Sequence, residues 1–505
     1  MKNPLVVNKV RVRFAPSPTG PLHIGGLRTA LFNYLFAKKT KGVFMVRIED
    51  TDRKREVAGA EEYIFKSLEW CGMQVDERTT DNSHRQSSRK ELYQSKAREL
   101  IKKRLAYYAF DSEKDLQKLR ESWGKKKETF IYNWKTREGL KNSLTLGDEK
   151  ANSMIAGGKA YVIRFLCPRN KNVVTDDIIR GAGNIDSSLI DDKILIKADG
   201  MPTYHFANVV DDNMMRISHV IRGEEWLPSL ALHVLLYEAF GWSPPKFAHL
   251  PLILNPNGKG KLSKRSGDSS GFPVFPLSWG KENKILGFKE AGFLPKALNN
   301  YMASLGWAAE NGEEIMNMDE LIENFKLEKV VSAAANFDFD RLKWVNQKHI
   351  TKMSNEELLH EIVKLFPETK TLENTRVLLA VGLVRDRAET ILDFWELMKY
   401  LFYAAEMFDE KAVRKLSEKT KDILEQGEKI ARALKNERPA NGGEKLIGQC
   451  LDWANKNNIK SAQIMMTLRL ALVGGLHGID LKKIISFIGV NETSSRFGRL
   501  RKALD

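Results

Sequence analysis

The chain has 505 residues, of which 42% are hydrophobic and 29% are charged, a balance that excludes disordered, collagen-like and low-complexity proteins. Lysines and arginines number 81 against 65 aspartates and glutamates, a formal net charge of +16, which favours either a polyanionic partner or simply a basic enzyme. The cysteines Cys71, Cys167 and Cys450 are few, scattered and odd in number, which argues against a disulfide framework and for a reducing compartment.

No segment has the pattern of a membrane-spanning helix. The most apolar late stretch, residues 464–479, carries Arg469 and His477 and is interrupted at Gly474. The first residues also lack the apolar core of a signal peptide. We therefore expect a cytoplasmic protein that does not engage a membrane.

The first hundred residues alternate strand and helix. Residues 10–14 and 43–48 are predicted strands, and apolar residues at helical spacing follow Gly25 and recur over 60–70. This order is typical of a parallel sheet with crossover helices. From about residue 102 to 199, a lysine-rich stretch and short strand-like pieces predict an α/β insertion, after which strand–turn–helix returns over 217–241.

Helical periodicity dominates beyond residue 340. Prolines become rare there, and Ser354 with Glu357 forms a capping-box pattern ahead of an apolar run. The fold class is therefore α/β with a parallel sheet and an inserted α/β segment, followed by an all-α region.

The loop over residues 15–26 has features of a phosphate site. It follows a predicted strand and opens a helix, so it lies at the carboxyl end of a parallel sheet, where the helix N-terminus attracts anions. Gly25 and Gly26 permit close backbone approach, and His23 can donate to a phosphoryl oxygen. The alternative is a proline-rich loop with a surface histidine.

A second loop, residues 259–267, concentrates cations and hydroxyls between glycines. Such a loop suits a polyphosphate whose negative charge rises in a transition state. A solvated basic loop is the alternative, and spacing alone does not decide between them.

Together the two loops resemble a known family. His23-Ile24-Gly25-Gly26 resembles the HIGH motif of class I aminoacyl-tRNA synthetases, and Lys261-Leu262-Ser263-Lys264-Arg265 resembles their KMSKS motif. Residues 13–20, 47–52, 203–212, 221–226 and 337–344 look like the corresponding blocks of the glutamyl-tRNA synthetases. The resemblance covers nearly the whole chain and implies a doubly wound, Rossmann-like catalytic domain.

The resemblance implies a glutamate–tRNA ligase, which activates L-glutamate with ATP and transfers it to the 3′-terminal adenosine of tRNA(Glu). It implies His23, Lys261 and Lys264 as catalytic residues, and as ATP-binding residues these three with Gly25, Glu225, Trp226, Leu254 and Ser263. The implied glutamate-binding residues are Arg13, Ser17, Glu49, Tyr204, Asn208 and Arg222. The guanidinium groups of Arg13 and Arg222 suit the two substrate carboxylates, and Glu49 suits the ammonium. A second buried guanidinium favours glutamate over glutamine.

The same resemblance divides the chain into five segments. It implies a catalytic domain in two halves (1–101 and 204–258), an insertion that binds the tRNA acceptor end (102–203), a KMSKS and stem-contact domain (259–340) and bacterial-type helical anticodon-binding domains (341–505). The basic run Arg496, Arg499, Arg501 and Lys502 either contacts tRNA phosphates or forms a solvated helix face. We expect a monomer that uses Mg²⁺ with ATP. No structural zinc is expected, because no cysteine lies between Cys71 and Cys167.

Two rival functions remain open. An adenylyltransferase of the same fold could act without RNA, but a long basic helical C-terminus is not needed for that chemistry. A non-catalytic tRNA-binding relative would not need His23, Lys264, Arg13 and Glu49. Whether tRNA(Gln) is also charged does not follow from the sequence.

Overall fold

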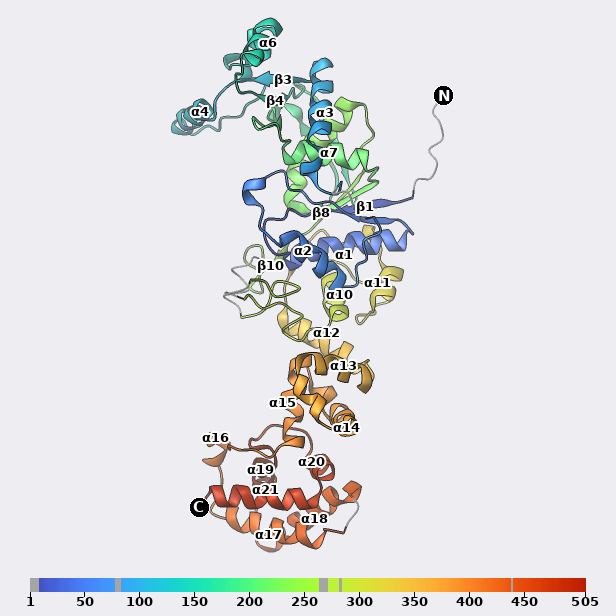
Figure 1. The fold of residues 1–505 in the computed structure, drawn as a ribbon, viewed down its shortest axis with the longest axis vertical. Coiled ribbons are helices and arrows are strands. Elements are labelled where there is room, and N and C mark those ends of the chain that lie inside the picture. Colours follow the sequence, from blue (N-terminus) through green and yellow to red (C-terminus); the bar gives the residue numbers. More distant parts are fainter. Residues whose placement is uncertain (1–8, 78–82, 263–270, 281–283, 437–438) are drawn as a thin grey trace. The chain divides into compact units, whose positions relative to one another are not determined.

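The computed structural model describes residues 9–77, 83–262, 271–280, 284–436 and 439–505 (Figure 1). They fall into two compact units, Met1–Glu290 with Pro295–Leu342, and Ala291–Leu294 with Lys343–Asp505. Within these described ranges, no helix combines the length and apolarity that crossing a membrane requires.

Parallel strands form the centre of the first unit. Strand β1 (Arg11–Phe14) pairs with β2 (Val43–Val46), and β9 (Lys246–Leu250) pairs with both β8 (His219–Gly223) and β5 (Asn172–Asp177), all in parallel. The backbone N–H of Ser218 donates to the Arg11 carbonyl at 2.9 Å, which joins the edges of β1 and β8. The strands predicted over 10–14 and 43–48 are confirmed.

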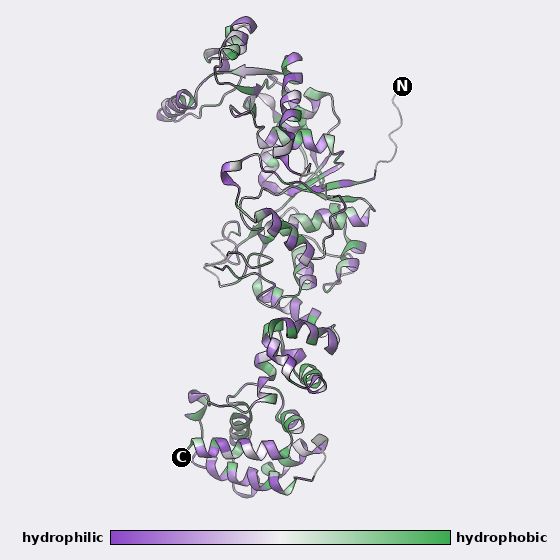
Figure 2. Ribbon diagram, viewed as in Figure 1, coloured by the Kyte–Doolittle hydropathy of each residue, from purple (hydrophilic) through white to green (hydrophobic). Residues whose placement is uncertain are grey.

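Crossover helices cover this sheet, as the alternating pattern predicted. They are α1 (Ile24–Lys39), α2 (Ala60–Trp70), α3 (Lys90–Lys102), α7 (Tyr204–Met214) and α8 (Leu230–Phe240). Most residues of α1 are buried, and Figure 2 shows hydrophobic residues along it. A strand or helix buried on most sides is typical of a parallel sheet covered on both faces.

The insertion contains its own antiparallel sheet of β3 (Ala106–Ala109), β4 (Val162–Phe165) and β7 (Ile194–Ile196). It also carries helices α4 (Glu113–Lys125), α5 (Ser143–Leu146) and α6 (Asp148–Ala156). Strand β5 forms a hairpin with β6 (Gly181–Asp186) and joins β9 of the central sheet. Part of the segment predicted as an insertion therefore extends the catalytic sheet.

The remainder of the first unit holds β10 (Ile253–Leu254) paired in parallel with β11 (Ala335–Asn336), and helices α10 (Pro295–Ser304) and α11 (Met318–Asn324). Helix α12 (Phe339–Thr351) spans the division between the units. Short 3-10 turns connect elements of both units: η1 (Arg53–Arg55), η2 (Gln86–Arg89), η3 (Arg137–Gly139), η4 (Ser187–Leu189), η5 (Glu224–Ser229), η6 (Leu327–Lys329), η7 (Pro367–Thr371) and η8 (Arg385–Arg387).

The second unit is helical, as predicted. Its helices are α13 (Asn355–Leu365), α14 (Asn374–Val384), α15 (Ile391–Phe402), α16 (Glu410–Val413), α17 (Thr420–Ala433), α18 (Pro439–Lys456), α19 (Ser461–Val473), α20 (Leu481–Ile488) and α21 (Val490–Ala503). The predicted capping box is present at the start of α13, where Ser354 and Glu357 exchange side-chain to backbone hydrogen bonds.

Arg496 does not belong to a solvated basic face. Its side chain is 1% exposed, and Nη1 donates to the carbonyls of Tyr400 at 2.6 Å and Leu472 at 2.9 Å. Both carbonyls lie in the last turn of a helix, where intrahelical donors are lacking. Arg496 therefore serves the packing of α21 against α15 and α19, and the interpretation of this residue as a tRNA contact is wrong.

We expect Arg496→Ala to lower the free energy of unfolding of the second unit by about 2–3 kcal/mol, because it leaves two buried carbonyls without a charged donor. Urea unfolding followed by circular dichroism measures this change. Arg499→Ala is the matched control, since Arg499 is exposed on the same helix and should change stability by less than about 0.5 kcal/mol. Equal stability of the two variants would contradict the structural role.

Candidate active site

The loop between β1 and α1 presents His23 at the N-terminus of α1. The backbone N–H of Gly25 donates to His23 Nδ1 at 3.1 Å. Because Nδ1 accepts this bond, the neutral ring carries its proton on Nε2. The helix N-terminus and the Nε2–H group together form a donor set suited to an anion.

A cavity of about 840 Å³, named cavity A, and one of about 410 Å³, named cavity B, lie in the first unit. Cavity B is lined by both predicted phosphate loops: His23, Gly25 and Gly26 from one, and Lys261 and Leu262 from the other. Ser263, Lys264 and Arg265, the rest of the KMSKS-like motif, lie outside the described residues.

Two other predicted nucleotide residues, Glu225 and Leu254, contact Lys261. Glu225 lines cavity B, and its Oε1 forms an ion pair with Lys261 Nζ at 3.0 Å. The backbone of Leu254 forms an antiparallel bridge with Lys261, which fixes the start of the second loop beside β10. At Gly26 an added Cβ would lie 2.7 Å from Leu22 Cδ1, so a larger residue there would require the Leu22 side chain to shift.

Sequence reasoning did not single out Arg28, which also lines cavity B. Its side chain is buried and donates to the backbone carbonyls of Leu305 at 2.9 Å and of Pro251. Burial lowers the pKa of Arg28 to about 10. An arginine on the otherwise apolar face of α1 was the signal for this residue.

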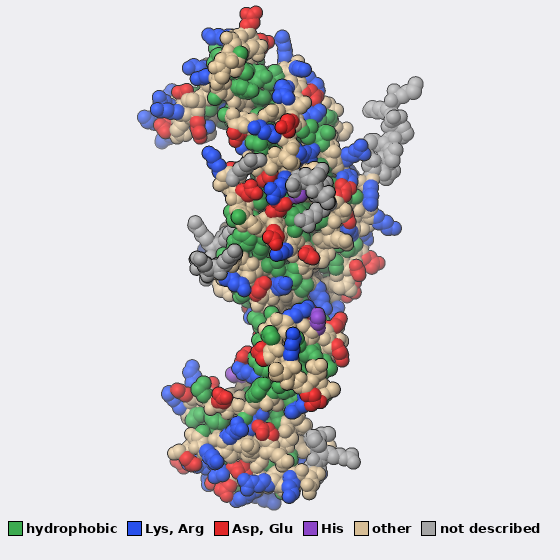
Figure 3. All heavy atoms as spheres, viewed as in Figure 1, with side chains coloured by type: hydrophobic (Ala, Val, Ile, Leu, Met, Phe, Trp, Pro, Cys, Tyr) green, Lys and Arg blue, Asp and Glu red, His purple; other side chains and the backbone are tan. Residues whose placement is uncertain are grey.

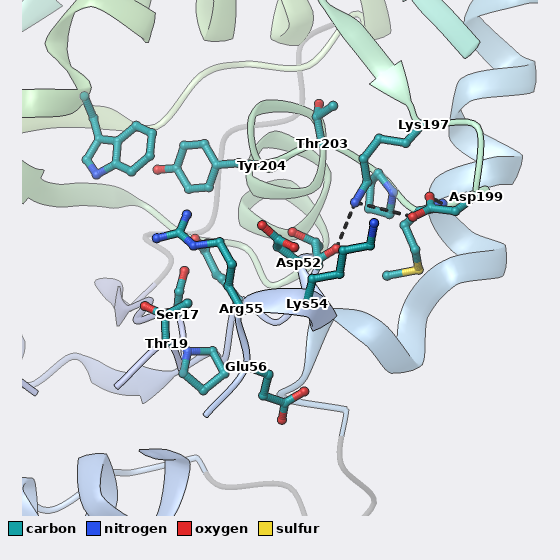
Figure 4. A pocket seen from close by; sticks show the side chains of 16 residues that line it. Ser17, Thr19, Asp52, Lys54, Arg55, Glu56, Lys197, Asp199, Thr203 and Tyr204 are labelled. Atoms are coloured by element: carbon teal, nitrogen blue, oxygen red, sulfur yellow. Dashed lines mark hydrogen bonds and ion pairs between the residues drawn. The ribbon is translucent and has the colours of Figure 1, made fainter. Parts of the chain in front are cut away.

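Cavity A is lined by Ser17, Glu49, Tyr204 and Trp226 among others, and Figure 4 shows Ser17 and Tyr204 on its wall. The Trp226 and Tyr204 rings stack with centroids 4.0 Å apart. Trp226 was predicted to contact adenosine, but it lines cavity A, whereas its neighbour Glu225 lines cavity B. Charged side chains complete the wall, namely Asp52, Lys54, Arg55, Glu56, Lys197 and Asp199.

A buried ion-pair network lies behind this wall. Arg13 contacts Asp212 through Nε at 2.9 Å and Nη2 at 3.2 Å, and Arg47 contacts Asp212 at 2.6 Å and Glu49 at 2.9 Å. Asn208 donates to the same Glu49 oxygen at 3.2 Å. Arg13 was expected to bind a substrate carboxylate through its guanidinium, and α7 brings Asp212 onto the Nε–Nη2 edge of that group.

The network shifts the pKa of its carboxyls in opposite directions. Burial raises the pKa of Glu49, and the adjacent Arg47 only partly offsets this effect. For Asp212 burial acts in the same direction, but Arg13 and Arg47 together outweigh it and lower the pKa. Asp212 therefore remains ionised between two guanidinium groups.

Arg222 lies at the end of β8 behind the stacked pair and is 5% exposed. Its Nε donates to His249 Nε2 at 2.9 Å, and its Nη1 lies 3.3 Å from His233 Nδ1. Two contacts of 3.5 Å, to the Tyr204 hydroxyl and the Trp226 carbonyl, face the cavity wall. No carboxylate among the described residues forms an ion pair with Arg222 within 4.0 Å.

The insertion holds a further cavity of about 540 Å³, named cavity C. Its lining includes the cations Arg120, Arg164 and Lys193 together with Tyr132 and His205. Figure 3 shows lysines, arginines and carboxylates interspersed over the visible face rather than segregated. Cations beside aromatic rings suit phosphates and unstacked bases.

Metal-ligand clusters are absent from the described part of the chain: no group of three His, Cys, Asp or Glu residues there could hold an ion. Cys71, Cys167 and Cys450 are free and buried, and burial raises the pKa of all three thiols. That the protein needs no structural zinc stays a prediction.

The family described as "tRNA synthetases class I (E and Q), catalytic domain" matches residues 9–344, and "Anticodon binding domain" matches residues 341–504. The fold and the paired loops are thus those of a class I aminoacyl-tRNA synthetase.

Similar proteins of named activity indicate the family within this class. The chain is 47% identical to a glutamate–tRNA ligase of Christiangramia forsetii, with 99% of both chains covered, and 46% identical to one of Flavobacterium johnsoniae, with 98% of this chain and 99% of that one covered. A crystal structure of a glutamate tRNA ligase from Elizabethkingia meningosepticum in complex with its amino acid matches with a TM-score of 0.91 at 44% identity, covering 99% of this chain and 100% of that one. The chain belongs to the glutamate–tRNA ligase family.

Proposed function

We propose that cavities A and B together activate L-glutamate with ATP and that the resulting glutamyl group is transferred to tRNA(Glu). The observation that carries this proposal is that His23 and Lys261, from loops far apart in the chain, line one cavity with Glu225, whose neighbour Trp226 lines the other. A nucleotide in cavity B would then have its reacting end directed toward an amino acid in cavity A.

The chemistry needs positioning and charge stabilisation more than covalent help from the protein. The α-carboxylate of glutamate attacks the α-phosphorus of ATP, pyrophosphate leaves, and the terminal hydroxyl of tRNA then displaces AMP from the acyl carbon. We assign His23 Nε2–H and Lys264 to the phosphoryl charge, Lys261 and Ser263 to the leaving pyrophosphate, and the Gly25 backbone to the nucleotide.

Glu225, the cavity-lining carboxylate, is already paired with Lys261. Because this carboxylate of cavity B is paired with a lysine, we assign Mg²⁺ to the ATP phosphates rather than to a cage of protein ligands. When bound, Mg²⁺ would neutralise phosphate charge. The residues of the chain would orient the phosphates around it.

Glutamate would use the polar wall of cavity A. Arg222 is assigned to the side-chain carboxylate, which would replace its two 3.5 Å contacts. Glu49 is assigned to the ammonium through Oε2, because Arg47 and Asn208 both bind Oε1. Ser17 and Tyr204 complete the polar lining. Arg13 gives its Nε–H and one Nη2–H to Asp212, so its two Nη1 hydrogens and the second Nη2 hydrogen are assigned to the α-carboxylate.

The tRNA would contact both units. The insertion with cavity C is assigned to the acceptor end, and the helical second unit to the anticodon, in keeping with the anticodon-binding family that matches it. We further propose that the enzyme acts as a monomer in the cytoplasm. Size-exclusion chromatography with light scattering tests the oligomeric state.

Glutamate-dependent ATP–pyrophosphate exchange tests the proposed function. Measured with and without tRNA(Glu), it should require glutamate and rise when the tRNA is added. Equal exchange in both conditions would favour an adenylyltransferase that acts without RNA. No exchange in either condition would favour a non-catalytic tRNA-binding protein.

We expect Lys261→Ala to lower the exchange rate by about tenfold to a hundredfold, because a charge-assisted contact to the leaving pyrophosphate is lost. The KM for glutamate should stay within about twofold, since Lys261 does not line cavity A. Lys259→Ala is the control, because Lys259 is exposed in the same loop and lies outside the cavity B lining. Equal rates in the two variants would remove Lys261 from its assigned role.

A further inference from the structure

Arg222 is held in a way that differs from the other buried arginines beside cavity A. Arg13 and Arg47 each contact the carboxylate of Asp212. Arg222 instead donates to nitrogen or neutral oxygen acceptors, of which His249 Nε2 at 2.9 Å is the nearest. Its positive charge is therefore fixed in place without being neutralised by a carboxylate in contact.

The His249 ring can accept from Arg222 only in one tautomer, and Asp177 imposes it. Asp177 Oδ2 lies 2.6 Å from His249 Nδ1, which keeps the ring proton on Nδ1 and leaves a lone pair on Nε2. Asp177 is itself fixed, because Oδ1 accepts from the backbone N–H groups of Ile179 at 3.0 Å, Arg180 at 2.9 Å and His249 at 3.3 Å. Both side chains are almost fully buried.

A second imidazole acts on the other side of Arg222. His233 Nδ1 lies 3.3 Å from Arg222 Nη1, and His233 Nε2 lies 3.1 Å from His205 Nδ1. Since Arg222 can only donate, His233 Nδ1 must accept, so its Nε2 donates to His205. Burial lowers the pKa of His233 and His249 and lowers that of His205 to about 4. Neutral rings are thus the favoured state throughout.

We propose that Asp177, His249 and His233 are positioning residues that select glutamate over glutamine by acting through Arg222. The inference rests on the proposed role of Arg222 as the partner of the substrate side chain. A carboxylate in contact with Arg222 would cancel the charge that attracts a substrate carboxylate, whereas neutral acceptors leave it available. A glutamine amide would meet this guanidinium with at most one acceptor, and its NH₂ would face N–H groups, so discrimination is strong.

Asp177→Asn tests the inference without altering the cavity A lining, to which Asp177 does not belong. The amide oxygen of the new side chain must stay on the three backbone N–H groups that now bind Oδ1. Its NH₂ group then faces His249 Nδ1 and drives the ring proton to Nε2. That proton would oppose the Nε–H of Arg222 and displace the guanidinium.

The measurement is kcat/KM for glutamate and for glutamine in ATP–pyrophosphate exchange with tRNA(Glu) present. We expect Asp177→Asn to lower the glutamate-to-glutamine ratio by about tenfold or more, with the KM for ATP within about twofold of the unmodified enzyme. Asp192→Asn is the matched control, a buried carboxylate bound to Tyr107, Arg137 and the Cys167 N–H elsewhere in the insertion. It should lower thermal stability without changing the ratio.

The outcomes separate the inference from the function on which it rests. An unchanged ratio in folded Asp177→Asn, together with a lost ratio in Arg222→Leu, would overturn the inference and keep the function. An unchanged ratio in Arg222→Leu would overturn the role of Arg222 itself. If Asp177→Asn does not fold, His249→Gln, which retains an acceptor, should preserve the ratio better than His249→Leu, and equal ratios in that pair would overturn the inference.

Discussion

Arg222→Leu should lower kcat/KM for glutamate by about a hundredfold to a thousandfold, because a substrate carboxylate would enter a desolvated site without its cation. Removing one partner of a buried charged contact costs about 2–5 kcal/mol, and about 1.4 kcal/mol corresponds to tenfold. Steady-state exchange kinetics with glutamate measure the loss. The rate with saturating glutamate should fall less than kcat/KM, since the side chain lies outside the reacting groups.

Arg222→Lys is the informative control. Lysine retains the charge but lacks the planar fork that donates to His249 and His233 at once. We expect kcat/KM for glutamate in Arg222→Lys to lie between the values of the unmodified protein and the leucine variant. A leucine variant that keeps its kcat/KM for glutamate would mean that the side-chain carboxylate binds elsewhere.

The second large effect is on stability. Asp212→Ala should lower the free energy of unfolding by about 3–5 kcal/mol, because it leaves Arg13 and Arg47 buried without their shared carboxylate. Urea unfolding at neutral pH measures this loss. Glu77→Ala removes a partly exposed ion pair with Arg11 in the same unit and should cost at most about 1 kcal/mol.

The same loss should depend on pH. The two arginines hold the pKa of Asp212 below its ordinary value, although burial opposes them. The stabilisation is therefore present above the pKa that the group has in the unfolded chain, and it disappears as the pH falls through the lower folded pKa. The stability difference between the unmodified protein and Asp212→Ala should accordingly shrink in acid, and a difference that grows on acidification would contradict the assignment.

Local sequence signals predicted the elements whose partners lie nearby. Helix α2 begins and ends where its apolar spacing does, and the box of Ser354 and Glu357 starts α13 as predicted. Strand β5 alternates exposed and buried residues, but its pairing with β9 joins Asp177 to Phe247, a contact distant in sequence that has no local signature. Sheet membership depends on contacts distant in sequence, which periodicity does not encode.

In the candidate site too, features that depend on neighbouring residues were predicted, and contacts between distant residues were not. The two glycine-bounded loops identified cavity B, because a helix N-terminus and a cluster of cations can be recognised from residues that are adjacent in the sequence. The Arg13–Asp212 contact joins residues 199 positions apart, and nothing beside Arg13 indicated that its fork was occupied. Arg496 likewise looked like part of a basic helix face, although two distant helix ends bury it.

A crystal structure of the protein with a non-hydrolysable glutamyl-adenylate analogue tests the central claim most directly. The account predicts the adenosine and phosphoryl group in cavity B between His23 and the loop that begins at Lys261, with the glutamyl side chain reaching Arg222. An analogue bound with its phosphoryl group away from both loops, or with its side-chain carboxylate on a cation other than Arg222, would contradict it.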